Sequence, residues 1–353
     1  QTMVLGLSGA KLLDALNYDP DIYHLNEAHA LSCVFHLYNK YNDVEAIKKK
    51  MVFTTHTPEE AGNEKHDINL LHSLSFFDGI PLEKVREITG IYDNTFNHTL
   101  VGLRLSHYAN GVSKLHGEVS RDMWKDFSGI CPITHVTNAQ NKKYWADAWL
   151  DEALQNNDRE ALIKRKTRLK SKLFDVVADQ TGKLFDPKIL TIVWARRFAE
   201  YKRPDLITRD YNRFIKLLSN TDKPVQIIFA GKPYPMDFGA IHNFDNLTHI
   251  SKNIKNMAVL TGHELKLSRQ LKEGADIWLN NPRVTREASG TSGMTAAMNG
   301  AINFSTNDGW VREFKDLNKT QNSFVLPIVD HTLPTYQQDQ MDLDNLYEML
   351  ENE

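Results

Sequence analysis

The residues of this chain best suited to chemistry lie in two segments, one rich in cations and one rich in small polar residues. The first segment, 194–204, contains four cations: Arg196, Arg197, Lys202 and Arg203. The second segment, 287–300, begins with a carboxylate, continues through serine, threonine and glycine, and then becomes apolar and favourable to a helix. Small residues ahead of a helix leave backbone N–H groups uncovered at its positive end, which suits a phosphate group. Cationic side chains facing that end would complete an anion site.

Each segment also has an ordinary explanation. A helix capped by serine or threonine would show the same small residues, and a solvated turn could carry the cations. A solvated turn, however, does not require an Arg-Arg pair between an apolar run and a proline. Considered together, the two segments favour an anion site.

Other catalytic and metal-binding patterns are weak in this sequence. No G-x-G-x-x-G, P-loop or nucleophile-elbow pattern occurs, so the common dinucleotide, NTPase and serine-hydrolase readings are not favoured. Glu287 and Asp308 could form the paired carboxylates of a hydrolase, but nothing in the sequence indicates a raised pKa for either. His56 and His66 do not have the spacing of a zinc site, so no metal is predicted.

The second half of the sequence predicts a scaffold that would bring the two segments together. Apolar runs alternate there with helical patterns, at 189–194, 225–230, 257–260, 276–279 and 301–305. Helices are expected between them, including an amphipathic one over 205–218. Strands buried on both faces and separated by helices indicate a parallel, doubly wound sheet. Loops after the carboxyl ends of such strands border one crevice, so the two segments should meet.

The first half mixes shorter strands and helices. Strands are predicted at 21–26, 51–58 and 132–138, and a strand, a turn and a helix ending at Trp124 are predicted from Val101 onward. A polar, turn-rich stretch at 179–187 marks a junction. We therefore expect two domains, 1–182 and 183–353.

Composition limits the partners and the compartment. The chain is 41% hydrophobic and 25% charged, as is typical of globular proteins, and its net charge of −3 provides no field for nucleic acid. No apolar run of about 18 residues occurs, so no membrane span is expected. The two cysteines are far apart, which fits a reducing cytoplasm. A basic run at 159–172 is interpreted as a solvated helix face rather than a polyanion site, because no aromatic platform accompanies it.

The two segments resemble the signature motifs of the glycogen (α-glucan) phosphorylases. The matching residues are Arg197-x-x-Glu200-Tyr201-Lys202-Arg203, Glu287-Ala-Ser-Gly-Thr-Ser-Gly-Met294, Asn299-Gly-Ala301 and Asp308-Gly309. In the first half, residues 24–29, 55–62, 110–116 and 137–138 resemble cleft motifs of the family's short bacterial branch. The resemblance covers nearly the whole chain. It implies an α/β fold of the GT-B type, with two Rossmann-like, doubly wound domains facing a cleft.

The resemblance also implies a reaction and a set of site residues. The reaction is reversible phosphorolysis of an α-1,4-glucan, glycogen or maltodextrin, to glucose 1-phosphate by a cytoplasmic hexosyltransferase. Arg197 and Lys202 would be the catalytic residues that hold the phosphate. The residues implied for substrate binding are His56, His116, Asn138, Glu287, Ser289 and Gly290. Those implied for the phosphate of the cofactor pyridoxal phosphate are Arg196, Thr291 and Ser292. A homodimer is left open.

One position departs from the family pattern. The family attaches pyridoxal phosphate through a lysine directly after the methionine of the motif, and this chain has Thr295 there. A hydroxyl cannot form a Schiff base, so covalent attachment is not expected. Either the cofactor binds noncovalently, another phosphate takes its place, or no cofactor binds. The alternatives are therefore a glucosyltransferase that uses a nucleotide sugar, similar to glycogen synthase, and a catalytically silent glucan-binding relative.

The second departure is length. Family members normally extend before the position of Gln1 and beyond that of Glu353. The first Rossmann-like domain is therefore expected to be incomplete. We expect the chain to be an excised piece with little activity by itself.

Overall fold

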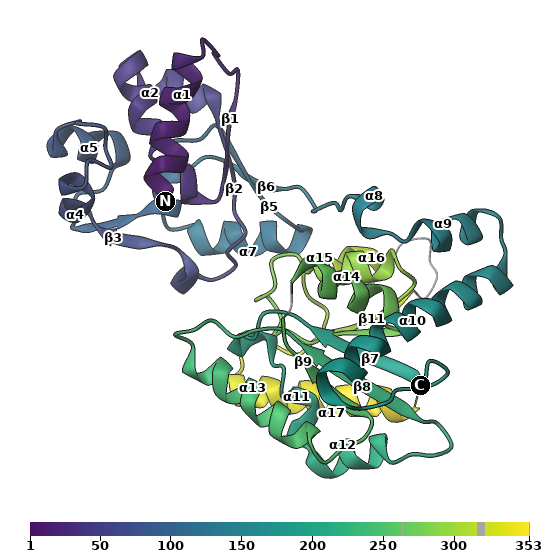
Figure 1. Ribbon diagram of the computed structural model, residues 1–353. Helices are drawn as coiled ribbons and strands as arrows, with labels where there is room; N and C mark the ends of the chain where they lie inside the picture. Colours follow the sequence, from purple (N-terminus) through teal and green to yellow (C-terminus); the bar gives the residue numbers. More distant parts are fainter. Residues whose placement is uncertain (263, 316–321, 353) are drawn as a thin grey trace. The chain divides into compact units, whose positions relative to one another are not determined.

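A computed structural model describes residues 1–262, 264–315 and 322–352 of the chain (Figure 1). It divides into two compact units, Gln1–Asn138 and Ala139–Glu353. Each unit contains a parallel β-sheet with helices packed against it (Figure 1). Two parallel sheets flanked by helices confirm the predicted α/β class and are consistent with the GT-B type.

The sheet of the second unit has six parallel strands in the order β12-β11-β10-β7-β8-β9. The strands are β7 (Leu190–Ala195), β8 (Val225–Ala230), β9 (Met257–Leu260), β10 (Ile277–Asn280), β11 (Ile302–Ser305) and β12 (Ser323–Val325). The first five match the predicted apolar runs, and β12 was not predicted. After β9 the chain returns to the other side of β7 to form β10. The strand order therefore reverses between β7 and β10, which is where doubly wound sheets bind ligands.

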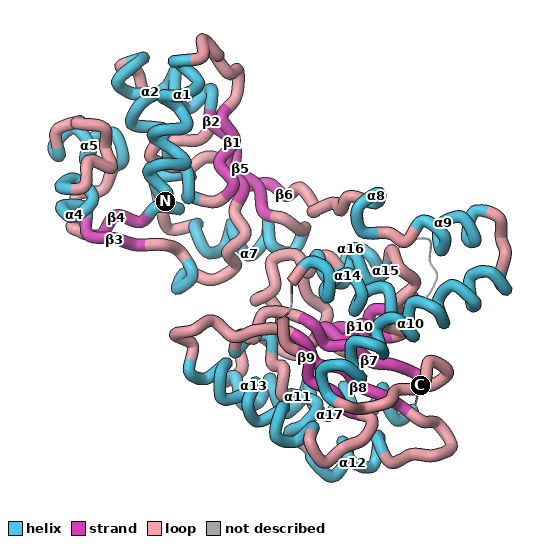
Figure 2. The backbone as a smooth tube through the Cα atoms, viewed as in Figure 1, coloured by secondary structure: helices cyan, strands magenta, loops and turns pink. Residues whose placement is uncertain are grey.

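Helices cover both faces of this sheet (Figure 2). Successive side chains of β7 point to opposite faces, so Val193 packs with one helical layer and Trp194 with the other. The layer on the Val193 face contains α10 (Arg159–Thr181), α14 (Leu265–Gly274) and α15 (Thr291–Ala297). The layer on the Trp194 face contains α11 (Leu206–Arg209), α12 (Tyr211–Leu218), α13 (Phe238–Ser251) and α17 (Thr335–Asn352). Shorter helices of this unit are α8 (Lys142–Trp145), α9 (Ala148–Gln155), η4 (Glu200–Lys202) and α16 (Val311–Phe314).

In this unit, the structure differs from the sequence-based predictions at the helix expected over 205–218 and at the junction expected at 179–187. The single helix predicted over 205–218 is two helices, because the Asp210 side chain accepts a hydrogen bond from the Arg213 N–H and starts α12 anew. The predicted junction at 179–187 lies between α10 and β7, inside the second unit. It does so because α10 is packed against the sheet through Leu173 and Val177.

The first unit has a four-stranded parallel sheet in the order β1-β2-β5-β6. These strands are β1 (Tyr23–Asn26), β2 (Met51–Thr54), β5 (Tyr108–Gly111) and β6 (Ile133–His135). The helices of this unit are η1 (Val4–Ser8), α1 (Gly9–Ala15), η2 (Ala28–Ala30), α2 (Cys33–Tyr41), α3 (Val44–Lys50), η3 (Glu60–Gly62), α4 (Ile68–Ser73), α5 (Leu82–Thr89), α6 (His98–Arg104) and α7 (Lys114–Trp124). An antiparallel pair, β3 (Lys65–Asp67) and β4 (Thr95–Asn97), completes it.

The strand predicted from Val101 was wrong at its start. Residues 101–104 belong to α6, which Asn97 caps by accepting a hydrogen bond from the Leu100 N–H, and the strand begins only at Tyr108. A fully buried helix and a buried strand present the same apolar run, which explains the error. Across the described residues, no helix combines the length and apolar character that crossing a membrane requires.

Candidate functional site

The cationic segment and the small-residue segment meet at one edge of the second sheet, as predicted. Neighbouring strands β7 and β10 end at Ala195 and Asn280, and the two segments follow these strands. Arg196 Nη2 donates to Glu287 Oε2 at 3.0 Å, and Lys202 Nζ lies 3.5 Å from the same oxygen. A carboxylate from one segment thus joins two cations from the other.

Burial and charge shape the titration of this cluster. Burial opposes ionisation of Glu287, but Arg196 and Lys202 outweigh it and lower the pKa of the carboxyl. Burial, with a smaller contribution from Arg196, lowers the pKa of Lys202 to about 8. Arg196 is only 5% exposed, and its Nη1 has no hydrogen-bond partner among the described residues. Leaving a buried guanidinium N–H unpaired is costly, so an acceptor at this position would be stabilising.

The other two cations of the segment behave differently from each other. Arg197 is exposed and lies beside Tyr201, whose pKa is raised to about 12 by burial and by the charge of Glu287. Arg203 is fully buried, and its guanidinium donates to the backbone oxygen of Asn281 and to Asp339. Arg197 is therefore available at the surface of the site, whereas Arg203 is part of the protein's internal packing.

The small-residue segment forms a tight turn ahead of α15. Gly290 has φ 93°, a left-handed conformation that favours glycine, and a Cβ there would lie 3.1 Å from the Trp310 ring. The backbone N–H of Trp310 donates to the backbone oxygen of Ser289 at 2.9 Å and holds the turn. The hydroxyl oxygens of Ser289 and Ser292 are buried without a hydrogen-bond partner among the described residues. Like Arg196 Nη1, they are polar groups that a ligand would satisfy.

The Asp308 carboxylate stabilises this turn by accepting two backbone hydrogen bonds. Its Oδ2 accepts from the Glu287 N–H at 2.9 Å, and its Oδ1 accepts from the Gly309 N–H at 2.9 Å. Burial raises the pKa of Asp308 to about 7, and the nearby charge of Glu287 adds to the effect. Asp308 therefore positions the backbone of Glu287 rather than forming a second catalytic carboxylate.

The predicted site residues of the first half follow the strands of the first unit. His56 follows β2, and its Nε2 lies 2.6 Å from Asn26 Oδ1; burial lowers its pKa. His116 is 1% exposed on α7 and accepts the Val112 N–H on Nδ1 at 3.2 Å, so its neutral ring carries the proton on Nε2. Burial lowers the pKa of His116 to about 4. Asn138 follows β6, and its N–H donates to the Val112 oxygen at 3.1 Å.

The predicted residues thus form two groups, one in each unit. The first unit contains His56, His116 and Asn138. The second contains Arg196, Arg197, Lys202, Glu287, Ser289, Gly290, Thr291, Ser292 and Thr295.

Comparisons with known proteins identify the family. A family model described as carbohydrate phosphorylase matches residues 147–352, more than half of the chain. The chain belongs to the carbohydrate phosphorylase family. It is 33% identical to the maltodextrin phosphorylase of Thermococcus litoralis, over 100% of this chain and 48% of that protein. It is 31% identical to the glycogen phosphorylase of Aquifex aeolicus, over 88% of this chain and 53% of that protein.

An uncharacterized protein of Methanocaldococcus jannaschii is also similar, at 46% identity over 88% of this chain and 58% of that protein. The chain spans about half the length of the curated relatives it matches.

Thr295 occupies the position at which the resemblance implies cofactor attachment, and its surroundings do not suit a covalent bond. The side chain is 1% exposed, and its hydroxyl donates to the backbone oxygens of Thr291 at 3.2 Å and Ser292 at 3.1 Å. The hydroxyl is therefore satisfied by the preceding turn of its own helix. The residues present fit the phosphate part of the cofactor, because Arg196 Nη1 and Ser292 Oγ are buried without hydrogen-bond partners among the described residues and could both donate to a phosphate oxygen. They do not provide an amine at position 295.

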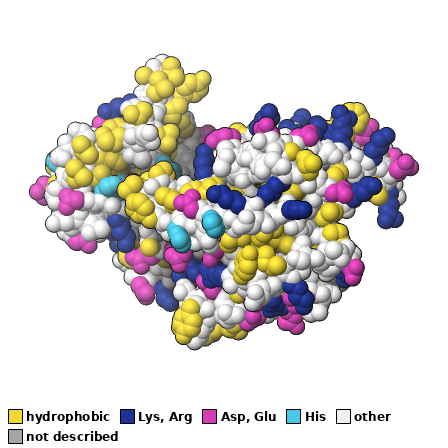
Figure 3. Space-filling view, turned by 60° about the horizontal axis from the view of Figure 1, so that its bottom comes forward, with side chains coloured by type: hydrophobic (Ala, Val, Ile, Leu, Met, Phe, Trp, Pro, Cys, Tyr) yellow, Lys and Arg dark blue, Asp and Glu magenta, His cyan; other side chains and the backbone are white. Residues whose placement is uncertain are grey.

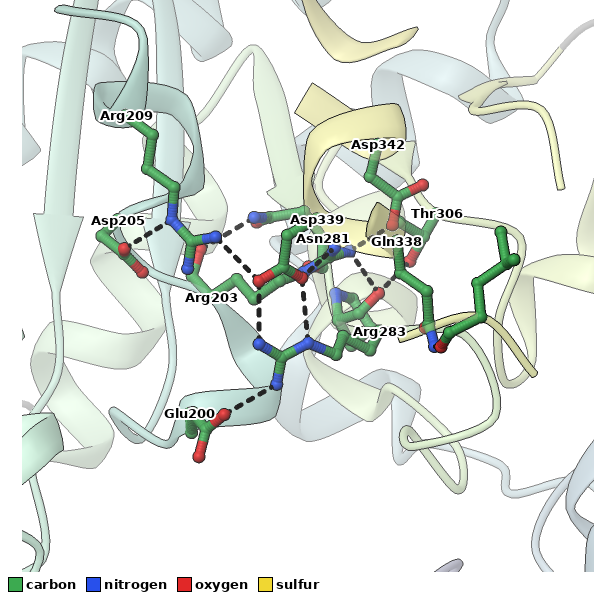
Figure 4. Close-up of polar contacts among 12 residues, drawn as sticks. Glu200, Arg203, Asp205, Arg209, Asn281, Arg283, Thr306, Gln338, Asp339 and Asp342 are labelled. Carbon is green, nitrogen blue, oxygen red and sulfur yellow. Dashed lines mark hydrogen bonds and ion pairs between the residues drawn. The ribbon is translucent and has the colours of Figure 1, made fainter. Parts of the chain in front are cut away.

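An ion network centred on the buried Asp339 was not predicted from the sequence (Figure 4). Asp339 on α17 accepts from three guanidinium groups, those of Arg203, Arg209 and Arg283, at 2.7–3.0 Å. Burial opposes the charge of Asp339, but the arginines hold its pKa far below the usual range. Arg283 also donates to Glu200 Oε1 at 3.1 Å.

We call these five residues the Asp339 network. It joins α17 to the turn that carries Lys202 and to the loop that leads into Glu287. Of the three arginines, only Arg203 stood out in the sequence, because it belongs to the cationic segment 194–204. Nothing marked its partner, which lies 136 residues later.

Among the described residues, no group of three or more His, Cys, Asp and Glu side chains is arranged to hold a metal ion.

Proposed function

We propose that this chain carries the phosphate- and glucose-binding residues of an α-glucan phosphorylase. The reaction is reversible phosphorolysis of an α-1,4-glucan, such as glycogen or maltodextrin, to glucose 1-phosphate in the cytoplasm. The observation that carries the proposal is the convergence of Arg196 and Lys202 on Glu287 at the strand-order reversal, with Arg196 Nη1 unpartnered among the described residues. Membership of the family supports the reaction class.

Each group in the site has a physical role in this proposal. Arg197 and Lys202 hold the phosphate that attacks the anomeric carbon, and their positive charge brings that anion next to the developing oxocarbenium-like centre. Glu287 keeps Arg196 and Lys202 in place through Oε2 and accepts a sugar hydroxyl through its other oxygen.

The remaining residues orient the sugar. The backbone N–H groups of Ser289 and Gly290 bind glucose hydroxyls. In the first unit, neutral His116 offers its Nε2 proton to the 6-hydroxymethyl end of glucose, where Asn138 and His56 also bind. Because burial keeps His116 neutral at physiological pH, it acts as a hydrogen-bond partner rather than a charge.

If pyridoxal phosphate binds, its phosphate group would supply acid–base chemistry near the substrate phosphate. Arg196, Thr291 and Ser292 would hold that phosphate group, and Thr295 excludes a covalent attachment at the family position. The same space would suit the distal phosphate of a nucleotide sugar. The absence of lysine at position 295 is the observation that favours a nucleotide-sugar glucosyltransferase as the second candidate, with a silent glucan-binding protein as the third.

One incubation separates these candidates. The native polypeptide that contains this sequence is incubated with maltodextrin and phosphate, with and without added pyridoxal phosphate, and glucose 1-phosphate is measured. Product in either condition is the expected result, and its absence in both would contradict the proposal. Extension of maltodextrin from a nucleotide sugar would instead support the second candidate, and glucan binding without turnover the third.

Replacement of Arg197 tests the phosphate site directly. Arg197→Ala should weaken binding of phosphate or glucose 1-phosphate by about 1.5–3 kcal/mol, because charge-assisted hydrogen bonds are lost. Isothermal titration calorimetry measures the change. Arg213→Ala is the matched control, because Arg213 is a surface arginine paired with Glu351 on the Trp194 face of the sheet. Equal affinity in wild type and Arg197→Ala would reject the assignment.

A further inference from the structure

A basic cavity lies between α9 and α10 of the second unit. Its volume is about 720 Å³, within the range of ligand pockets. It is lined by Trp149, Ala161, Lys164, Arg165, Arg168 and Lys172. Lys and Arg side chains gather at the right-hand end of the view in Figure 3, on the side where Figure 1 shows α9 and α10. None of these residues belongs to the site around Glu287.

The structure divides the basic run of α10 into two sets. Lys166 and Lys170 turn inward: Lys166 donates to the backbone oxygens of Glu273 and Asn299 at 2.9 and 2.8 Å. Lys170 is 4% exposed and pairs with Asp276 at 2.5 Å. The charges of these two lysines are therefore used to attach α10 to the rest of the unit.

The second set faces the cavity. Lys164, Arg168 and Lys172 recur every four residues, so they lie on one face of the helix. All three are exposed, and none has an ion pair or hydrogen bond with any described residue. At 1.5 Å per residue they form a stripe about 12 Å long. Because no carboxylate among the described residues forms an ion pair with these three cations, the stripe is suited to an extended anion.

The aromatic platform that the run itself lacks comes from α9. Trp149 is 64% exposed, and the Arg165 guanidinium lies 6.0 Å from its ring centroid. Arg165 is fixed in turn by two hydrogen bonds to Asp147, at 2.9 and 2.5 Å. An exposed indole held beside a row of cations is the combination that binds a base together with its phosphates. The earlier interpretation of the run as a solvated face thus applies to the run alone, without its tertiary neighbour.

We propose that this cavity binds a nucleoside polyphosphate, with the base against Trp149 and the phosphates along Lys164, Arg168 and Lys172. The three cations and the exposed indole line one cavity, so a ligand that carries both an aromatic base and several phosphates can contact them together. A neutral glucan would leave the cations without acceptors, and inorganic phosphate would leave the indole unused. The proposal is independent of phosphorolysis, because it uses none of the residues assigned to that reaction.

Binding of ATP, adenosine and tripolyphosphate, measured by calorimetry at low and moderate salt, tests the proposal. ATP should bind saturably, tripolyphosphate at least about tenfold more weakly, and adenosine not detectably, because ring and phosphates act together. Arg168→Gln/Lys172→Gln should weaken ATP binding at least about tenfold and flatten its salt dependence. Trp149→Ala should weaken ATP and leave tripolyphosphate unchanged.

Two controls make the result specific. Lys216→Gln/Lys223→Gln removes two exposed lysines from α12 and the loop after it, on the Trp194 face of the sheet, and should leave ATP binding unchanged. Arg197→Ala should also leave it unchanged, which separates this cavity from the proposed phosphate site. Undetectable ATP binding, loss of binding with either control, or tripolyphosphate binding as tight as that of ATP with no effect of Trp149→Ala would each overturn the proposal.

Discussion

Lys202 carries a charge in a buried position, so pH should control anion binding at the proposed phosphate site. Burial, aided by Arg196, lowers its pKa to about 8. A lysine with this pKa is charged below pH 8 and neutral above it. Sulfate affinity should therefore fall as pH rises through about 8, since sulfate keeps the same charge throughout.

Lys202→Arg provides the comparison, because a guanidinium stays charged over this range. The variant should retain sulfate affinity to higher pH when both proteins are titrated calorimetrically. Identical pH profiles for the two proteins would show that Lys202 is not the titrating group.

Thr295 should prevent covalent cofactor attachment. Its hydroxyl is bonded to the preceding helical turn, and no amine is present at this position. After incubation with pyridoxal phosphate and reduction with borohydride, peptide mapping should find no label in residues 287–300. Thr295→Lys restores the family's amine and should become labelled there. A trapped adduct at another lysine of the wild-type protein would contradict noncovalent binding.

At the scale of elements, α17 stabilises the loops of the site through the Asp339 network. Breaking a buried ion pair by removing one partner costs about 3–5 kcal/mol, because the remaining charges stay buried. Asp339→Asn should lower the free energy of unfolding by that amount, measured by urea denaturation. Glu351 lies on α17 like Asp339 and forms a surface pair with Arg213. Glu351→Gln should therefore lower the free energy of unfolding by at most about 1 kcal/mol. Equal effects of the two substitutions would argue against the network.

The contribution of the Asp339 network to stability should depend on pH. Arginines hold the folded-state pKa of Asp339 far below that of the unfolded chain. A lowered acid pKa stabilises the folded state above the unfolded value, near 4, and this contribution is lost as pH falls below it. The difference in stability between wild type and Asp339→Asn should therefore shrink in acid.

At the scale of the whole molecule, the two units have separate hydrophobic cores. One buried cluster of the first unit extends over residues 10–133, and those of the second unit begin at Leu173. Each core is expected to unfold as its own cooperative step.

Core substitutions should therefore act on one step each. The side chains of Phe53 in the first unit and Phe229 in the second are fully buried. Phe53→Ala and Phe229→Ala should each lower the free energy of unfolding of their unit by about 3–5 kcal/mol. Calorimetric scans should show two transitions, with each substitution lowering a different one. A single transition that both substitutions shift equally would show that the units unfold together.

Local patterns were sufficient for much of the fold and for the main parts of the site. The five apolar runs of the second half predicted β7 to β11, because strands buried on both faces need continuous apolar sequence. The doubly wound order then predicted that the segments 194–204 and 287–300 would border one crevice. Errors arose where one pattern serves two structures, as at residues 101–104, and where a single side chain such as Asp210 divides a helix.

The residue types and their spacing were sufficient to predict an anion site, to reveal the resemblance to the phosphorylases, and to show that threonine stands at the position where the resemblance implies a cofactor lysine. Tertiary structure decided which charges are available to ligands. It turned Arg203 inward to Asp339, attached Lys166 and Lys170 to the rest of the second unit, and placed Trp149 in one cavity with Lys164, Arg168 and Lys172. The physical reason is that the partner of a charge depends on which elements pack together. Such contacts join residues far apart in the chain, where periodicity and motif spacing carry no information.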